Sequence, residues 1–230
     1  MPARPHAVAF DVLETLLNLE PLRARLETIG QPAQLLQPWF MRFQRDSMAL
    51  ALSGDFRTFE SVARQALRTD TNHTATEEDI DHVLAGFAEL PAYPDAEPAL
   101  RMLSEAGLRV GCLTVGSAQN TARFLEQAGL ARHVDHVVTA DQAGIWKPAP
   151  SVYRVTAREL GTSPQNLALV AVHAWDCHGA KRAGCLAGWC DRLEGRYGDV
   201  FTAPDVSGAD LVQVAEGLLR LNPVPRPAAE

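Results

Sequence analysis

The chain has 230 residues, of which 47% are apolar, and its formal net charge is −7 at pH 7. This size can bury one substantial core, or a core domain that carries a smaller inserted domain. The negative charge makes nucleic acids and anionic membrane surfaces unfavourable partners. No apolar run approaches the roughly 20 residues that span a bilayer, and the amino terminus does not resemble a secretion signal. We therefore expect a cytoplasmic protein.

The first predicted element is a buried strand over residues 7–10, where four apolar residues run directly into Asp11. An aspartate at a strand end often only turns the chain. However, burial penalises a charged carboxylate unless another group compensates it. Asp11 is therefore a candidate functional residue as well as a turn residue.

Residues 20–90 show helical periodicity, which is interrupted at residues 30–32, 53–55 and 70–76. This pattern predicts an all-helical insertion after the first strand. We assign residues 1–18 and 92–230 to a core domain and residues 19–91 to the inserted helical domain.

From residue 96 onward, predicted helices and strands alternate. This order predicts an α/β fold with a doubly wound parallel sheet, covered by helices on both faces. A proline-rich tail over residues 222–230 is expected to be frayed. The predicted helices are 96–107, 119–129, 150–160, 175–184 and 208–221, and the predicted strands are 108–115, 133–140, 167–172 and 186–190.

The four cysteines do not have the C-x-x-C spacing typical of a metal site. Most of them lie in segments that read as buried strand or helix, and a cytoplasmic compartment disfavours disulfides. We expect reduced core thiols at Cys112, Cys177, Cys185 and Cys190.

Ligands of such sheets bind beyond the carboxyl ends of the strands. The first strand delivers Asp11 to this edge, and the second delivers Thr114. The strand over residues 167–172 is followed by His173 and Asp176, and the loop after residue 140 carries Lys147. A carboxylate, a hydroxyl, an ammonium and a second carboxylate are thus expected at one edge of the sheet.

Four motifs in this order resemble the haloacid dehalogenase-like hydrolase superfamily over nearly the whole chain. They are FDVLETL, LTVGS, KPAPSVY and VAVHAWD. The resemblance implies a Rossmann-like core, a mobile helical cap over the site, and Asp11 as the nucleophile. Lys147 would keep Asp11 ionised, so that it can form a covalent ester which water then hydrolyses.

The resemblance also suggests roles for the other motif residues. Thr114 could donate a hydrogen bond to Asp11 or to the substrate. Asp176 could hold Lys147 or orient the hydrolytic water. His173 is either the general base for that water or a hydrogen-bonded histidine that shapes the pocket.

Leu13 points to one branch of the superfamily, the (S)-2-haloacid dehalogenases. Family phosphatases usually place a second aspartate at this position to protonate the leaving alkoxide, and leucine cannot supply a proton. A halide leaves without protonation. The KPAPSVY motif with Tyr153, the segment that follows His173, and the basic and aromatic helix PWFMRFQRD also resemble that branch.

The chain departs from well-known members of this branch at several positions. Phe40 stands where they carry an arginine, Leu13 where they carry an aromatic residue, and Val115 and His173 where they carry asparagines. A cation must still hold a substrate carboxylate, and Arg42 is a slightly better candidate than Arg45; both arginines could equally serve only as solvated surface residues. The expected substrate-binding residues are Leu13, Thr15, Phe40, Arg42, Val115, Tyr153 and Trp175.

The expected activity is hydrolytic dehalogenation of small 2-haloacids without a cofactor. One alternative is a magnesium-dependent phosphatase, in which Asp11, the Leu13 carbonyl and Asp176 would bind the ion. A second alternative is a dehalogenase-like protein that has lost catalysis and binds a ligand or partner. The expected partner is a halogenated carboxylic acid, and a homodimer is a reasonable further expectation.

Overall fold

The computed structural model describes residues 3–222, and most of the predicted tail lies outside this range. Its centre is a six-stranded sheet in the order β3-β2-β1-β4-β5-β6, in which all neighbouring strands are parallel. From β1 the chain builds β2 and β3 on one side and then crosses to β4 on the other side, so a topological switch point lies at the carboxyl end of β1. The strands are β1 (Ala7–Phe10), β2 (Arg109–Thr114), β3 (His136–Thr139), β4 (Leu167–Ala171), β5 (Leu186–Cys190) and β6 (Val206–Gly208).

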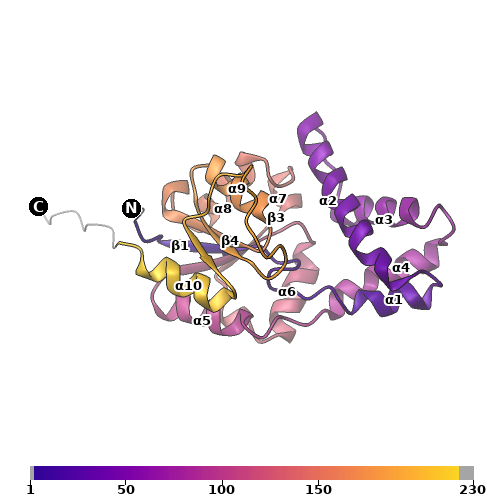
Figure 1. Ribbon diagram of the computed structural model, residues 1–230, viewed down its shortest axis with the longest axis horizontal. Coiled ribbons are helices and arrows are strands. Elements are labelled where there is room, and N and C mark those ends of the chain that lie inside the picture. Colours follow the sequence, from indigo (N-terminus) through magenta and orange to yellow (C-terminus); the bar gives the residue numbers. More distant parts are fainter. Residues whose placement is uncertain (1–2, 223–230) are drawn as a thin grey trace, which may run out of the picture.

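Helices cover both faces of this sheet (Figure 1). Alternate residues of a strand point to opposite faces. Val8 and Phe10 of β1 face the core formed with α5, α6 and α10, whereas Ala7 and Ala9 face α8 and α9. The core helices are α5 (Ala96–Glu105), α6 (Ala118–Gln127), α7 (Ala140–Ala143), α8 (Pro150–Glu159), α9 (Ala174–Arg182) and α10 (Leu211–Arg220). The doubly wound α/β fold is confirmed.

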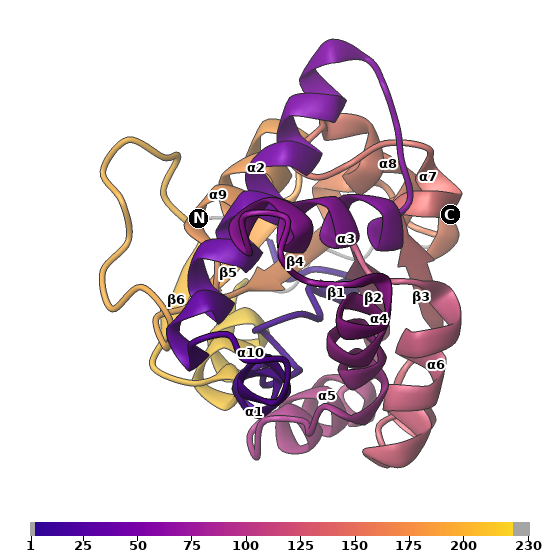
Figure 2. The same ribbon diagram turned by 90° about the vertical axis from the view of Figure 1, so that its right-hand side faces the viewer.

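The inserted segment is helical, as predicted, and stands beyond the core at one end of the molecule (Figures 1 and 2). Gly54, at a φ of +75°, ends the longest of these helices, and a capping box of Thr76 and Asp79 begins the last one. The helices are α1 (Leu22–Thr28), α2 (Leu36–Ser53), α3 (Phe59–Asp70) and α4 (Glu77–Ala85), with short 3-10 turns at Ala33–Leu35 and Gly86–Glu89.

Two neighbouring chain segments connect the insertion to the core. Leu17 and Ala92 form an antiparallel bridge. The amide of Asn18 donates to the Pro91 carbonyl, and the amide of Tyr93 donates to the Leu16 carbonyl, each at 2.9 Å. The domain division at residues 18/19 and 91/92, which stays a prediction, falls beside these contacts.

The structure adds two elements that the sequence interpretation missed, β6 and α7. β6 lies where we expected the approach to the last helix, which begins at Leu211 rather than at residue 208. The third predicted strand is also shorter than expected: β3 begins at His136, and a 3-10 turn occupies Ala131–His133.

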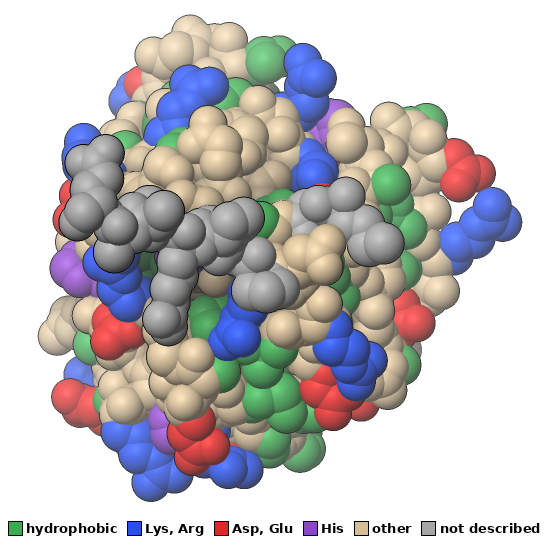
Figure 3. Space-filling view, turned by 90° about the vertical axis from the view of Figure 1, so that its left-hand side faces the viewer, with side chains coloured by type: hydrophobic (Ala, Val, Ile, Leu, Met, Phe, Trp, Pro, Cys, Tyr) green, Lys and Arg blue, Asp and Glu red, His purple; other side chains and the backbone are tan. Residues whose placement is uncertain are grey.

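The four cysteines are buried free thiols, as expected. Burial raises the pKa of the Cys112 thiol to about 12, so it stays protonated at neutral pH. Within residues 3–222, no helix combines the length and apolarity needed to cross a bilayer. Figure 3 shows the end of the molecule opposite the insertion. Among the described residues of this face, acidic and basic side chains are interspersed.

Candidate active site

Asp11 follows the last residue of the central strand and is buried with 4% of its surface exposed. Its amide donates to the Val170 carbonyl at 2.9 Å, which fixes the backbone against β4. The hydroxyl of Thr15 donates to Oδ2 of Asp11 at 2.7 Å and accepts from the Val172 amide at 3.2 Å. Thr15 therefore orients the carboxylate from behind rather than facing a ligand.

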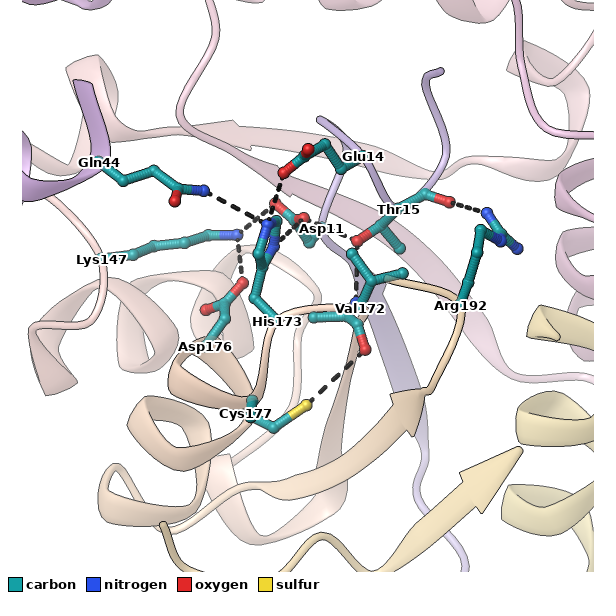
Figure 4. A network of polar contacts seen from close by, with 12 residues as sticks. Asp11, Glu14, Thr15, Gln44, Lys147, Val172, His173, Asp176, Cys177 and Arg192 are labelled. Carbon is teal, nitrogen blue, oxygen red and sulfur yellow. Dashed lines mark hydrogen bonds and ion pairs between the residues drawn. The ribbon is translucent and has the colours of Figure 1, made fainter. Parts of the chain in front are cut away.

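Lys147 joins two buried carboxylates (Figure 4). Its Nζ donates to Oδ1 of Asp11 at 2.9 Å and to Oδ2 of Asp176 at 2.8 Å. The hydroxyl of Tyr153 donates to the other oxygen of Asp176 at 2.6 Å. The sequence predicts Asp11, Lys147 and Asp176 at one edge of the sheet, and the structure brings them, together with Tyr153, into one hydrogen-bonded chain.

The charges in this chain shift one another's pKa values. Burial alone would raise the pKa of Asp11, but the Lys147 ammonium and the His173 ring outweigh burial and hold it well below its usual range. Burial alone would lower the pKa of Lys147, but Asp11 and Asp176 outweigh burial and raise it. At neutral pH the site therefore contains an ionised carboxylate beside an ammonium group, which is the state required of a carboxylate nucleophile.

His173 lies near Oδ2 of Asp11, the oxygen that Thr15 also contacts, whereas Lys147 contacts Oδ1. Its Nε2 is 2.8 Å from Oε2 of Glu14, and its Nδ1 is 3.5 Å from Oδ2 of Asp11. Burial alone would lower the pKa of this ring, but Asp11 and Glu14 outweigh burial and raise it to about 10. A ring that is protonated at neutral pH cannot accept a proton from water. The charge of His173 therefore favours a pocket-shaping role over that of general base.

A cavity of about 20 Å³, which has room for about one water molecule, lies against these groups. Most of its wall is apolar, so charge inside it is poorly screened. The lining residues are Asp11, Leu13, Phe40, Phe43, Gln44, Ser47, Met48, Val115, Trp146, Lys147, His173 and Trp175.

The predicted arginine clamp is not found at this cavity. Arg42 points to Asp70 of α3, and the two pair at 2.6 Å. Arg45 is exposed and pairs with Asp46. Both lie on α2, but their helical positions turn them away from Asp11. Among residues 3–222, no arginine lines the cavity.

The other predicted substrate-binding residues divide into two groups. Leu13, Phe40, Val115 and Trp175 line the cavity, as expected. Tyr153 is fully buried behind it and contacts Asp176 instead.

Thr114 shows no hydrogen bond to Asp11. It is buried, and its hydroxyl accepts from the Gly116 amide at 2.9 Å, so it shapes the turn after β2. The expected hydrogen bond from Thr114 to the nucleophile is therefore not formed in this structure.

Sequence reasoning missed Glu14 and Gln44. Glu14 sits inside the first motif with a φ of +67° and pairs with His173. Gln44 shares a helical face with Phe40, Phe43 and Ser47, since residues three and four apart lie on one side of a helix. A polar residue within that mainly apolar face was the available signal.

The site offers a poor set of ligands for magnesium. Each of the four carboxylate oxygens of Asp11 and Asp176 already accepts a hydrogen bond, from Lys147, Thr15 or Tyr153. The ammonium lies between the two carboxylates, where a bridging cation would lie. In the described part of the chain, no three His, Cys, Asp or Glu side chains are grouped as metal ligands. A divalent ion bound here would have to share these oxygens with their hydrogen-bond donors and lie beside an ammonium group.

Comparisons with known proteins show the family to which the chain belongs. The family model described as haloacid dehalogenase-like hydrolase matches residues 5–184. An (S)-2-haloacid dehalogenase 4A of Burkholderia cepacia is 30% identical over 183 residues, which cover 77% of this chain and 79% of the relative. A phosphoserine phosphatase of Thermus thermophilus is 33% identical over 207 residues, which cover 87% of this chain and 80% of the relative.

Solved structures show the same fold. The L-2-haloacid dehalogenase RSc1362 superposes with a TM-score of 0.87 at 27% identity, covering 95% of this chain and 100% of that one. The L-2-haloacid dehalogenase of Xanthobacter autotrophicus with covalently bound chloropropionic acid has a TM-score of 0.85 at 24% identity, covering 94% and 98%. The second likeness shows the fold alone.

Proposed function

Since the chain belongs to the haloacid dehalogenase-like hydrolase family, we propose that it hydrolyses the carbon–halogen bond of a small 2-haloacid. A carboxylate oxygen of Asp11 attacks carbon 2 of the substrate, and the halide leaves with the bonding electron pair. Water then attacks the carboxyl carbon of the Asp11 ester, which releases a 2-hydroxy acid and restores the carboxylate. The net reaction consumes one water and releases one halide and one proton.

The observation that carries this proposal is the Lys147 ammonium between the Asp11 and Asp176 carboxylates. It keeps Asp11 ionised in a small apolar cavity, where a carboxylate is poorly solvated and therefore a stronger nucleophile. Asp176 holds the ammonium in place, and Tyr153 holds Asp176. Leu13 cannot protonate an alkoxide, and halide departure needs no acid.

A magnesium-dependent phosphatase is the second candidate, because one relative at 33% identity is named a phosphoserine phosphatase. It would require Asp11, the Leu13 carbonyl and Asp176 to bind the ion. Two features weigh against it: the carboxylate oxygens are committed to Lys147, Thr15 and Tyr153, and Leu13 cannot act as an acid. We propose that the reaction uses no metal ion or other cofactor.

One assay separates the candidates. The protein is incubated with chloroacetate, fluoroacetate and L-2-chloropropionate in the presence of EDTA, and released halide is measured for the wild type and for Asp11→Asn. We expect release from the wild type alone. Phosphate release from phosphoserine that requires magnesium, without halide release, would support the phosphatase instead. Inactivity toward both substrate classes would support a binding protein without catalysis.

A further inference from the structure

The nitrogens of His173 have unequal surroundings (Figure 4). Nε2 has two neighbours, Oε2 of Glu14 at 2.8 Å and Nε2 of Gln44 at 3.3 Å. Nδ1 is buried, and it makes no hydrogen bond in the structure although Asp11 Oδ2 lies 3.5 Å away. The ring lines the catalytic cavity and is only 5% exposed. A buried ring nitrogen that makes no hydrogen bond beside a cavity indicates a group to which a ligand can hydrogen-bond.

The two contacts of Nε2 cannot both be satisfied as hydrogen bonds. If Nε2 carries a proton, it donates to Glu14, and the amide nitrogen of Gln44 faces a second donor. The pair with Glu14 is the shorter contact, and its charge favours this protonated state. The amide of Gln44 is then available to a ligand in the cavity, which Gln44 also lines.

We propose that the Nδ1–H of His173 and the amide of Gln44 bind the carboxylate of the substrate, and that Glu14 is the positioning residue that holds the imidazole for this task. This inference rests on the proposed function. It supplies the anion-binding groups that Arg42 and Arg45 do not, because both arginines are paired with other carboxylates away from the cavity. Gln44 comes from the inserted helix α2 and His173 from the core, so a bound carboxylate would connect the two parts.

The position of His173 matches the substrate carboxylate better than the leaving halide. In a displacement reaction the halide departs opposite the attacking oxygen. Nδ1 lies 3.5 Å from Oδ2 of Asp11 and hence on the side of the nucleophile. The carboxylate is attached to the attacked carbon and can reach this side. The apolar lining, which includes Phe40, Phe43 and Trp146, remains for the halide.

Binding of acetate tests the proposal without requiring turnover. Trp146 and Trp175 line the cavity, so acetate and its neutral analogue acetamide are titrated by tryptophan fluorescence at constant ionic strength. Gln44→Leu and His173→Asn should each weaken acetate binding by about tenfold or more, with little effect on acetamide. For chloroacetate, Gln44→Leu should raise KM about tenfold and change kcat by less than about threefold.

Glu14→Gln and Gln37→Leu complete the set. Glu14→Gln should weaken acetate binding as His173→Asn does, while thermal melting confirms folding. Gln37 lies two turns before Gln44 on the same helix and lines an outer hollow but not the catalytic cavity. Gln37→Leu should bind acetate like the wild type, which separates a loss of the amide from a general effect on the helix.

The outcomes separate this inference from the proposed function. Unchanged acetate affinity in Gln44→Leu and His173→Asn, or equal affinity of the wild type for acetate and acetamide, would overturn the anion site while halide release upholds the dehalogenase. Selective acetate binding that both variants lose, without halide release from any haloacid, would uphold the anion site and overturn the dehalogenase. If Asn at position 173 prevents folding, Gln44→Leu decides alone, since its side chain is only half-buried.

Discussion

The ammonium of Lys147 lies between two buried carboxylates, so its removal should affect both stability and activity. In Lys147→Met, Asp11 and Asp176 lose their shared positive partner and repel each other. We expect the free energy of unfolding to fall by about 3–5 kcal/mol at pH 7 and halide release to fall by at least about 100-fold. Urea unfolding and halide assays measure the two effects.

Lys181 offers the matched control. It pairs with Asp205 at 2.8 Å, away from the cavity. Lys181→Met should cost only about 1 kcal/mol and keep the activity of the wild type. Equal losses of halide release in the two variants would contradict the role of Lys147.

His173 should make the stability of the protein depend on pH. Asp11 and Glu14 raise the pKa of this ring to about 10 despite its burial. A raised pKa stabilises the folded state below the unfolded value of about 6.5, and the contribution is lost as the pH rises through about 10. Between these limits the free energy of unfolding should fall by up to about 1.4 kcal/mol per pH unit in the wild type relative to His173→Asn. Urea unfolding from pH 6 to pH 10 measures this difference. If the free energies of unfolding of the two proteins changed with pH in parallel, His173 would not carry the proposed positive charge.

Helix α9 contacts the site through Gly179 as well as through Asp176. A Cβ at Gly179 would lie 2.5 Å from the Tyr153 hydroxyl oxygen and 2.7 Å from Cβ of Pro148, the residue after Lys147. Gly179→Ala should therefore push Tyr153 or Pro148 aside. We expect about 1–3 kcal/mol of destabilisation and at least about tenfold slower halide release per folded molecule.

Gly217→Ala is the matched control on α10. Its Cβ would lie 2.2 Å from Cγ1 of Val206, and neither Gly217 nor Val206 lines the catalytic cavity. It should destabilise the protein by a similar amount and leave halide release unchanged. If Gly179→Ala were equally active, packing of α9 would not position the site.

The core elements were predictable because their sequence patterns are strong and repeated. The strands β1, β2, β4 and β5 are apolar runs followed by polar residues, and helices with one apolar face separate them. β6 has only three residues, and these are Val-Ser-Gly, with no alternating or continuous apolar signal. It forms because β5 offers a free edge, which is a property of the assembled sheet.

The site could be predicted where a motif residue lies at a strand end or in the segment that follows a strand. Asp11 follows β1, Lys147 lies in the segment after β3, Asp176 lies in the segment after β4, and the three meet as expected. Arg42, Glu14 and Gln44 do not, because the direction of a helix or of a tight turn decides where their side chains point. Arg42 pairs with Asp70 of α3, and no spacing in the sequence predicts that contact.

The inserted helices and the core pack against each other beside the cavity. Phe43 of α2 packs edge-on against Trp146 of the core, with ring centroids 5.7 Å apart, and Phe56 lies 5.5 Å from the same ring. The buried apolar cluster runs continuously from the insertion into the sheet. Both parts of the chain therefore contribute side chains to the wall of the cavity. Assembly into a homodimer and a cytoplasmic location stay predictions.

The small cavity should restrict the length of the substrate. We expect kcat/KM for chloroacetate and L-2-chloropropionate to exceed that for 2-chlorohexanoate by at least about tenfold, because extra methylenes must displace packed side chains. Met48 lines the cavity, so Met48→Ala should narrow this difference. Met41, on the same helix, is 61% exposed and does not line the cavity, so Met41→Ala should not. Equal kcat/KM for the short and long substrates in the wild type would contradict a site whose size limits the substrate.

The transient ester on Asp11 can be observed directly with an isotope. Enzyme in excess over chloroacetate is allowed one turnover in water labelled with oxygen-18, and the glycolate and the peptide that contains Asp11 are analysed by mass spectrometry. We predict that the first glycolate carries unlabelled oxygen at its hydroxyl group and that Asp11 gains the label. Labelled hydroxyl in the first glycolate, with no label in Asp11, would mean that water attacks the substrate directly, and it would contradict the nucleophilic role of Asp11.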